Sequence, residues 1–346
     1  MTSDDRGGPA SGGWAPGGSG TITIAALLGG RLGEWTDGAA IEALGDGLLE
    51  QVRQTEASTL WIDLGDPDAA TVSRVAELLG LHPLIAEDIV EGNQRPKLEA
   101  TDGLIHVVVF ALEYTDEVRT HEVDFVLGDR FILSAHPADW DPRAAAHFRS
   151  GIAQVMGPGP DHVLWALLDA IVDGYFPFAD RLEDAIDTLQ DDVVERTDQD
   201  TLTRLFGLKR DLIDVRRAVT PVREVLNQLT NRELRLVDAN EVIYFRDIYD
   251  HVIRLTDELD TDRELVAATL DVYLSTVNNN LSAIMKRLTG ATVILAGIGA
   301  IAGIFGMSEA GAAFGGGEAI GFWIVAIVTI TISLIAAFLL RRIGWI

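Results

Sequence analysis

The 346-residue chain contains no cysteine. This absence excludes disulfide bonds, zinc sites with cysteine ligands and thiol catalysis. Motifs of common enzyme classes are also missing, because the chain has neither a Gly-x-x-x-x-Gly-Lys-Ser/Thr phosphate loop nor a Gly-x-Ser-x-Gly nucleophile turn. The pair His121-Glu122 lacks the second histidine of a zinc-protease helix. The sequence therefore predicts a protein that is not an enzyme.

Basic residues are scarce: 27 Lys and Arg stand against 53 Asp and Glu, for a net charge of −26. Nucleic-acid binding needs a basic face that neutralises phosphates, so this composition argues against nucleic acid as a partner. An acidic surface keeps a protein soluble, and it also attracts cations. The N-terminus lacks the basic-then-apolar pattern of a signal peptide, so we expect no export of the soluble part.

Apolar residues are concentrated near the C-terminus, and the mean hydropathy is +0.19 despite the many charges. After Arg287, about 20 residues carry no ionisable group, which is enough to cross a hydrocarbon core of roughly 30 Å. A second apolar run follows a glycine-rich connection. We therefore predict a transmembrane domain over residues 289–346, with two helices at about 289–307 and 320–340.

Charges that flank the two runs predict how this hairpin is oriented. A basic pair at 286–287 precedes the first run and another at 341–342 follows the second, whereas the connection carries only acidic charges. Basic residues stay on the cytoplasmic side of a membrane. We expect a membrane protein in contact with lipid, with both termini in the cytoplasm.

The region before the membrane domain divides into three parts. Residues 1–20 are mostly Gly, Ser and Pro and are predicted to be disordered. Residues 21–158 alternate between strand-like and helical patterns, which predicts a cytoplasmic α/β domain around one sheet. The expected strands are 21–27, 60–64, 104–113, 123–127 and 131–134, with a helix over 69–79 and a hairpin at Gly128-Asp129.

Residues 159–288 are predicted to form a stalk domain of long helices. Apolar residues recur every three or four positions over 162–195, 202–229 and 240–286. Asp198 is a candidate N-cap between the first two of these segments. The first segment carries many acids and few bases, so its charged face is either solvated and neutralised by the arginines of the second, or attracts cations near a pore.

The third helical segment continues into the membrane without a break. No proline or glycine interrupts it before Gly290, so we expect one helix of roughly 65–70 residues, about 100 Å long, that ends near Met307. A helix of this length needs partners alongside it, and the simplest partners are copies of the same chain.

Small and apolar residues share one face of the first membrane helix. Two helices cannot enclose a water-filled path, so conduction requires several chains around an axis. The face either packs closely against another helix or lines a pore. In a pore, Met285 and Leu288 would form apolar rings that gate by dewetting. Its members, spaced by three or four, are Met285, Leu288, Thr292, Ala296, Gly299 and Gly303.

Several segments resemble the CorA family of divalent-cation channels, strongly from Tyr244 to Met307 and weakly from about residue 75. The family ends its first membrane helix in Gly-Met-Asn, whereas this chain has Gly306-Met307-Ser308. The segments that carry the resemblance are Tyr244-Phe245-Arg246-Asp247, Tyr273-Leu274-Ser275 with the asparagine run after it, Met285-Lys286, Leu288-Thr289 and Gly303-Ile304-Phe305-Gly306-Met307.

The resemblance implies a homopentamer that conducts Mg²⁺ or Co²⁺, opens when internal Mg²⁺ falls and needs no organic cofactor. It makes the small-residue face of the first membrane helix the pore lining, with Ser282 at the inner mouth, and it places the selectivity filter at Gly306, Met307 and Ser308. Glu309 could add a carboxylate ring beside Ser308, whose short hydroxyl replaces the family's amide.

The segment 81–99 also resembles the family, in which an acidic residue of a short helix helps to bind a regulatory divalent ion between subunits. Asp88 matches that position. The resemblance assigns Asp247 as the residue that faces Asp88 across the interface, and Asp271 as an acidic position near the same interface. Without the resemblance, the segment would be a solvated turn broken by Pro96.

Two departures keep other functions open. Ser308 replaces the family's Asn, and Gly297 stands where relatives often have proline. The alternatives are a transporter of Zn²⁺ or another transition ion, and a non-conducting membrane protein that senses metal. Four scattered histidines are interpreted as ordinary surface or packed residues: His82, His106, His121 and His136.

Overall fold

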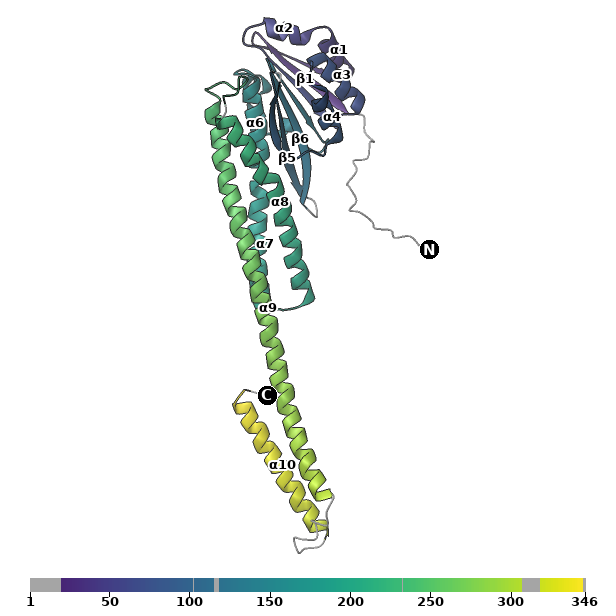
Figure 1. Cartoon of the computed structure of the whole chain (residues 1–346), viewed down its shortest axis with the longest axis vertical. Helices are drawn as coiled ribbons and strands as arrows, with labels where there is room; N and C mark the ends of the chain where they lie inside the picture. Colours follow the sequence, from purple (N-terminus) through teal and green to yellow (C-terminus); the bar gives the residue numbers. More distant parts are fainter. Residues whose placement is uncertain (1–19, 102, 115–117, 232, 307–317, 345–346) are drawn as a thin grey trace, which may run out of the picture. The chain divides into compact units, whose positions relative to one another are not determined.

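Figure 1 shows the computed structural model, which describes residues 20–101, 103–114, 118–231, 233–306 and 318–344. The chain forms two compact units. The first comprises Met1–Asp187 and Phe206–Val266, and the second comprises Thr188–Leu205 and Ala267–Ile346.

A seven-stranded sheet forms the centre of the first unit, with the strand order β2-β1-β3-β7-β6-β5-β4. Strands β3 and β7 pair in parallel, and the other neighbouring pairs are antiparallel. The strands are β1 (Thr21–Leu28), β2 (Arg31–Thr36), β3 (Thr59–Gly65), β4 (Lys97–Thr101), β5 (Leu104–Tyr114), β6 (Val118–Gly128) and β7 (Phe131–His136).

Helices cover both faces of the sheet. On one face, α1 (Asp37–Gly45), α2 (Leu48–Gln54), α3 (Ala69–Leu79) and α4 (Pro83–Glu91) bury a core that includes Ile62 and Leu133. On the other face, Trp61 stacks on Phe148 at 5.0 Å between ring centroids. That face is covered by η1 (Pro142–Ala144), η2 (Ala146–Ser150), α5 (Ile152–Met156) and α6 (Pro160–Asp173).

Local sequence signals explain the elements that were predicted correctly. Asp68 accepts a hydrogen bond from the Thr71 amide at 2.7 Å and caps α3, which ends at Gly80 in the left-handed region (φ 69°). The hairpin at Gly128-Asp129 is also confirmed, since Gly128 pairs with Phe131. A side chain at Gly128 would collide with the Phe131 ring, so any larger residue here would require this buried ring to move.

Some elements of the α/β domain were not predicted. Strand β2 and helices α1 and α2 follow β1 without a strong periodic signal, and β6 begins five residues before the predicted run 123–127. The exposed N-terminal half of β6 pairs with β5 through backbone hydrogen bonds, which place no demand on side-chain hydrophobicity.

The helical region begins with a correction. The apolar pattern over 162–195 is not one helix but two, α6 and α7 (Phe176–Glu195), because the chain breaks at Gly174 and Tyr175. The Tyr175 ring is fully buried and its hydroxyl donates to the Phe110 carbonyl of β5. This anchor ties the break to the sheet.

The next helix, α8 (Gln199–Asn231), confirms the predicted segment 202–229 and begins after Asp198. The Asp198 carboxylate accepts from the Thr201 amide at 2.9 Å, as expected for an N-cap. Part of the acidic face of α7 is neutralised by α8, because Arg204 pairs with Asp192 at 2.5 Å.

Helix α9 (Val242–Gly306) has 65 residues and confirms the predicted long helix. Its stalk half buries a stripe that includes Phe245, Val252 and Leu259. The side chains of its apolar half are largely exposed in the single chain. A last helix, α10 (Glu318–Arg342), carries Arg341 and Arg342 in its final turn.

Candidate functional site

Asp88 is held on the short helix α4 by strong local signals. His82 caps the helix, with its Nδ1 accepting from the Leu84 amide at 3.2 Å, and Pro83 occupies the first turn. Ile85 and Ile89 are buried against the sheet. Asp88 precedes Ile89 and therefore lies at the edge of the packed face, where its side chain is 21% exposed. The short helix that the resemblance implied for this segment is thus confirmed.

In the single chain, Asp88 is paired with a lysine. The Lys97 ammonium donates to Asp88 Oδ2 at 2.8 Å and lies 3.4 Å from Glu99 Oε1. Burial lowers the pKa of Lys97, but the hydrogen bond and charge of Asp88 outweigh it and raise the pKa overall. The position between the two carboxylates therefore favours a positive charge.

The sheet face beneath α4 carries a polar cluster. His106 Nε2 lies 2.7 Å from Asp124 Oδ1, and both side chains are buried. Burial raises the pKa of Asp124, against the opposing effect of His106. Burial and the charge of Asp124 also raise the pKa of Glu122 to about 8, so this carboxyl group holds its proton at neutral pH.

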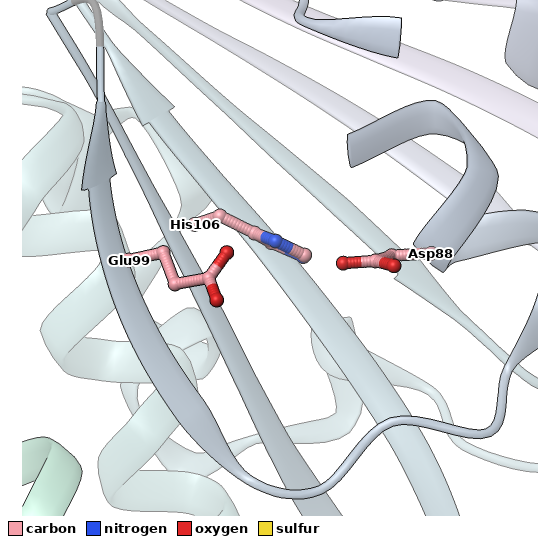
Figure 2. Close-up of side chains that lie close together, drawn as sticks. All are labelled: Asp88, Glu99 and His106. Carbon is pink, nitrogen blue, oxygen red and sulfur yellow. The ribbon is translucent and has the colours of Figure 1, made fainter. Parts of the chain in front are cut away.

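Asp88, Glu99 and His106 form a candidate metal-binding group. One ligand atom from each lies within 4.8 Å of the others. Figure 2 shows the three side chains converging from α4, β4 and β5. The sequence analysis did not name Glu99 and interpreted His106 as an ordinary residue, because the cross-strand pairing that joins them is a feature of the tertiary fold.

A second candidate metal-binding group joins α6 to α9. Asp169, Asp173 and His251 bring ligand atoms within 4.8 Å of one another. Asp169 Oδ2 also lies 2.6 Å from His147 Nε2. Burial and the charge of Asp169 raise the pKa of Asp173, while His251 and His147 oppose this shift. The sequence analysis missed these three residues.

Asp247, one of the predicted regulatory residues, lies one helical turn before His251. The two therefore share a face of α9, and this spacing of four is the signal that could have pointed to the second group. Asp247 and Asp271 are both exposed. Within the described part of the first unit, no hydrogen bond or ion pair joins Asp88 to Asp247.

The predicted pore residues lie along the exposed half of α9. Met285 and Leu288 are 53% and 60% exposed, and Thr292 turns its hydroxyl back to the Leu288 carbonyl at 2.8 Å. Ser282, Ala296 and Gly299 are exposed as well. Gly306 is the last residue of α9, whereas Met307, Ser308 and Glu309 of the predicted filter lie outside the described residues.

By length and composition, α9 is the one helix of the described part of the chain that could cross a membrane. The predicted second span, 320–340, coincides with α10 and stays a prediction.

Comparison with known proteins shows to which family this chain belongs. The family model described as "CorA-like Mg2+ transporter protein" matches residues 56–342, well over half of the chain. The chain belongs to the CorA family. Its resemblance to that family, inferred above from separate motifs, is confirmed.

Two relatives of this chain are named for the transport of different metals. A cobalt/magnesium transport protein CorA of Thermotoga maritima is 36% identical over 256 residues, which is 72% of this chain and 72% of that protein. The zinc transport protein ZntB of Yersinia pseudotuberculosis is 22% identical over 284 residues, which is 80% of this chain and 86% of that protein.

The CorA fold is confirmed as well. The complete structure of the CorA magnesium transporter from Methanocaldococcus jannaschii matches with a TM-score of 0.78 at 22% identity, over 94% of this chain and 98% of that one. An α/β domain, long helices and a C-terminal helical region are therefore the CorA architecture. The family is one of transporters, in agreement with the absence of enzyme motifs from the sequence.

Proposed function

We propose that this CorA-family chain conducts divalent cations, Mg²⁺ or Co²⁺, through the inner membrane as a homopentamer. The observation that carries the proposal is the exposed apolar half of α9. Large apolar side chains are uncovered there in a single chain, and soluble monomers rarely expose so much apolar surface. They include Leu281, Ile284, Met285, Leu288, Val293, Leu295 and Ile304.

Copies of the chain and lipid together would cover this surface. One chain offers too few helices to enclose a water-filled path, so the path lies on an axis shared by several copies of α9. The face with Met285 and Leu288 then forms two narrow apolar rings, and the small residues Ala296 and Gly299 leave a wider passage beyond them. Lipid contacts the remaining surface and α10.

The filter is proposed to act on a hydrated ion. Mg²⁺ gives up its water shell reluctantly, so oxygen atoms that accept hydrogen bonds from those waters suit it better than direct ligands. Backbone at Gly306 and Met307 and the hydroxyl of Ser308 would supply such oxygens. We propose that Glu309 adds a carboxylate ring that offsets the weaker Ser308.

Gating is proposed to depend on internal Mg²⁺ held between subunits. Asp88, Asp247 and Asp271 offer carboxylates that would meet across neighbouring copies, and the exposure of the two on α9 supports this. With Mg²⁺ bound, the charges are neutralised and the closed assembly is stabilised. Without it, like charges face each other and the interface loosens.

The orientation follows from the basic pairs at 286–287 and 341–342. We propose that both termini and the α/β domain lie in the cytoplasm, where Asp88 can sense the internal ion.

The first test is divalent-cation flux into proteoliposomes that hold the full chain. We expect Mg²⁺ uptake by the wild type, and greater uptake by Ser308→Asn, because an amide reaches further and accepts more strongly than a hydroxyl. Glu309→Ala is expected to lower uptake. Unchanged uptake in Glu309→Ala would remove the role given to that carboxylate.

A transporter of Zn²⁺ is the second candidate, and both the Ser308 departure and the relative named for zinc transport favour it. Competition between Mg²⁺ and Zn²⁺ for uptake separates the two. If the wild type takes up neither ion while Mg²⁺ still protects it from thermal unfolding, the chain senses metal without conducting it.

A further inference from the structure

We propose that Asp88, Glu99 and His106 of one chain bind a divalent transition-metal ion of the Zn²⁺ class. This site lies within a single α/β domain, so it differs from a regulatory ion held between subunits. It does not rest on the proposed transport function, although it shares Asp88 with the proposed gating site.

Backbone pairing fixes two of the three ligands. Glu99 of β4 lies directly opposite His106 of β5 in the antiparallel register, so their side chains project from the same sheet face as neighbours. Helix α4 lies over this face and directs Asp88 towards both (Figure 2). Three rigid elements thus place one nitrogen and two carboxylate ligands together.

The histidine is prepared for metal binding. His106 is 1% exposed, and its Nε2 bonds Asp124 Oδ1 at 2.7 Å. Nδ1 has no hydrogen-bond partner among the described residues although it is buried. A buried nitrogen without a partner destabilises a fold, whereas a carboxylate behind one ring nitrogen and a metal at the other is a common arrangement. His106 therefore has one ring nitrogen, Nδ1, available as a metal ligand.

Lys97 shows that a cation is favourable at this place. Its ammonium lies between Asp88 and Glu99, at 2.8 Å from the first carboxylate and 3.4 Å from the second. Lys97 acts as an internal cation that a metal ion would displace. A lysine ammonium only donates hydrogen bonds, and no bond from it reaches His106 in the described structure.

The ligand set selects the class of ion. Mg²⁺ prefers oxygen ligands and keeps several waters, whereas Zn²⁺ accepts imidazole nitrogen and carboxylate oxygen at about 2.0–2.2 Å. One imidazole and two carboxylates leave a fourth position for water. Excess Mg²⁺ would therefore occupy the all-oxygen sites, and at this site it would compete only for the shared Asp88, because imidazole nitrogen suits Zn²⁺ rather than Mg²⁺.

The test is Zn²⁺ titration of the full chain in detergent with Mg²⁺ in large excess. Wild type is expected to bind one Zn²⁺ per chain at this site. Glu99→Gln is expected to lower the affinity for this ion by about tenfold or more, and His106→Gln is expected to abolish its binding. Lys97→Met is expected to raise the affinity for the same ion by about tenfold, because the lysine ammonium no longer competes for the two carboxylates. Glu91→Gln removes the same charge from exposed α4 surface and should change nothing.

Two further variants separate this site from its neighbours. Asp173→Asn disables the second candidate group. This variant must therefore still bind the ion whose affinity Glu99→Gln lowers. Asp247→Asn disables the proposed intersubunit site and must also leave that ion bound. The transport proposal is tested by flux, so it can fail or stand independently of this binding result.

Three outcomes would overturn the proposal. They are the absence of Zn²⁺ binding in excess Mg²⁺, equal Zn²⁺ affinity in wild type, Glu99→Gln and Lys97→Met, or loss of the ion in Asp247→Asn. Glu99 is 57% exposed on its side chain, so Glu99→Gln keeps the fold even if the buried His106→Gln does not. Thermal unfolding of each variant checks this.

Discussion

Asp262 of α9 is a single residue whose charge conflicts with its surroundings. It is only 3% exposed, and its Oδ2 finds no hydrogen-bond partner in the described chain. Burial raises its pKa, and the nearby carboxylates of Glu258, Glu183 and Asp187 raise it further, to about 6. At neutral pH the folded chain therefore carries a buried charge that destabilises it.

This gives a pH dependence of a defined sign. The folded state keeps the Asp262 proton up to about pH 6, while the unfolded state releases it near the ordinary value of 3.8, so the folded state binds more protons between these limits. Stability therefore falls as pH rises through this window and the full cost is present above pH 6. Asp262→Asn is expected to stabilise the protein at pH 7.5 by about 1–2 kcal/mol, and hardly at all near pH 4.

Unfolding of the full chain by denaturant at pH 4, 5.5 and 7.5 measures this effect. Asp257→Asn removes an exposed carboxylate from the same helix and is the matched control, with an expected change below about 0.5 kcal/mol at each pH. An equal gain for Asp262→Asn at all three values would contradict the assignment.

At the scale of one element, α9 performs two tasks along its length. Its first half is a stalk helix whose stripe from Phe245 to Val266 packs into the first unit. After Arg287 it carries no ionisable side chain and is largely exposed, as a membrane helix would be in a single chain. One continuous helix can form both parts, because the backbone keeps the same helical period where its surroundings change from the stalk to the apolar segment.

The stalk half of α9 should respond to mutation as a core helix does. Phe245 is fully buried, so Phe245→Ala is expected to lower the free energy of unfolding by about 3–5 kcal/mol. Ile243, two residues earlier, is 66% exposed, and Ile243→Ala is expected to cost less than about 1 kcal/mol. Denaturant titration of the two variants measures the contrast, and similar losses would show that this end of α9 is covered by another copy.

At the scale of the whole molecule, the proposed pore depends on rings of identical side chains. Met285→Asn would replace an apolar ring by a polar one that stays wet, so we expect Mg²⁺ uptake to rise severalfold when internal Mg²⁺ is high. Ala283 lies on the opposite face of α9, and Ala283→Asn is the matched control. Proteoliposomes loaded with Mg²⁺ provide the measurement.

A rise in uptake that is equal in both variants would indicate a general loosening of the helices. No change in either would argue that Met285 packs against a neighbouring helix, which is the other interpretation of the small-residue face.

Much of the architecture could be predicted from local pattern. The boundaries of α3 and the continuity of α9 follow from caps and from the periodicity of apolar residues, which act over a few neighbouring positions. Charge-free length predicted the span in α9, and the Tyr244 to Met307 motifs predicted the CorA family. These features are written in the sequence because each depends on residues that are close along the chain.

Tertiary structure alone decided which distant residues meet. The break at Tyr175 depends on a buried hydroxyl that reaches the Phe110 carbonyl, 65 positions earlier. The pairing of His106 with Glu99 depends on strand register, and its meeting with Asp88 depends on where α4 crosses the sheet. A histidine that looked ordinary in the sequence thus becomes a candidate ligand, because its surroundings are set by packing rather than by its neighbours in the chain.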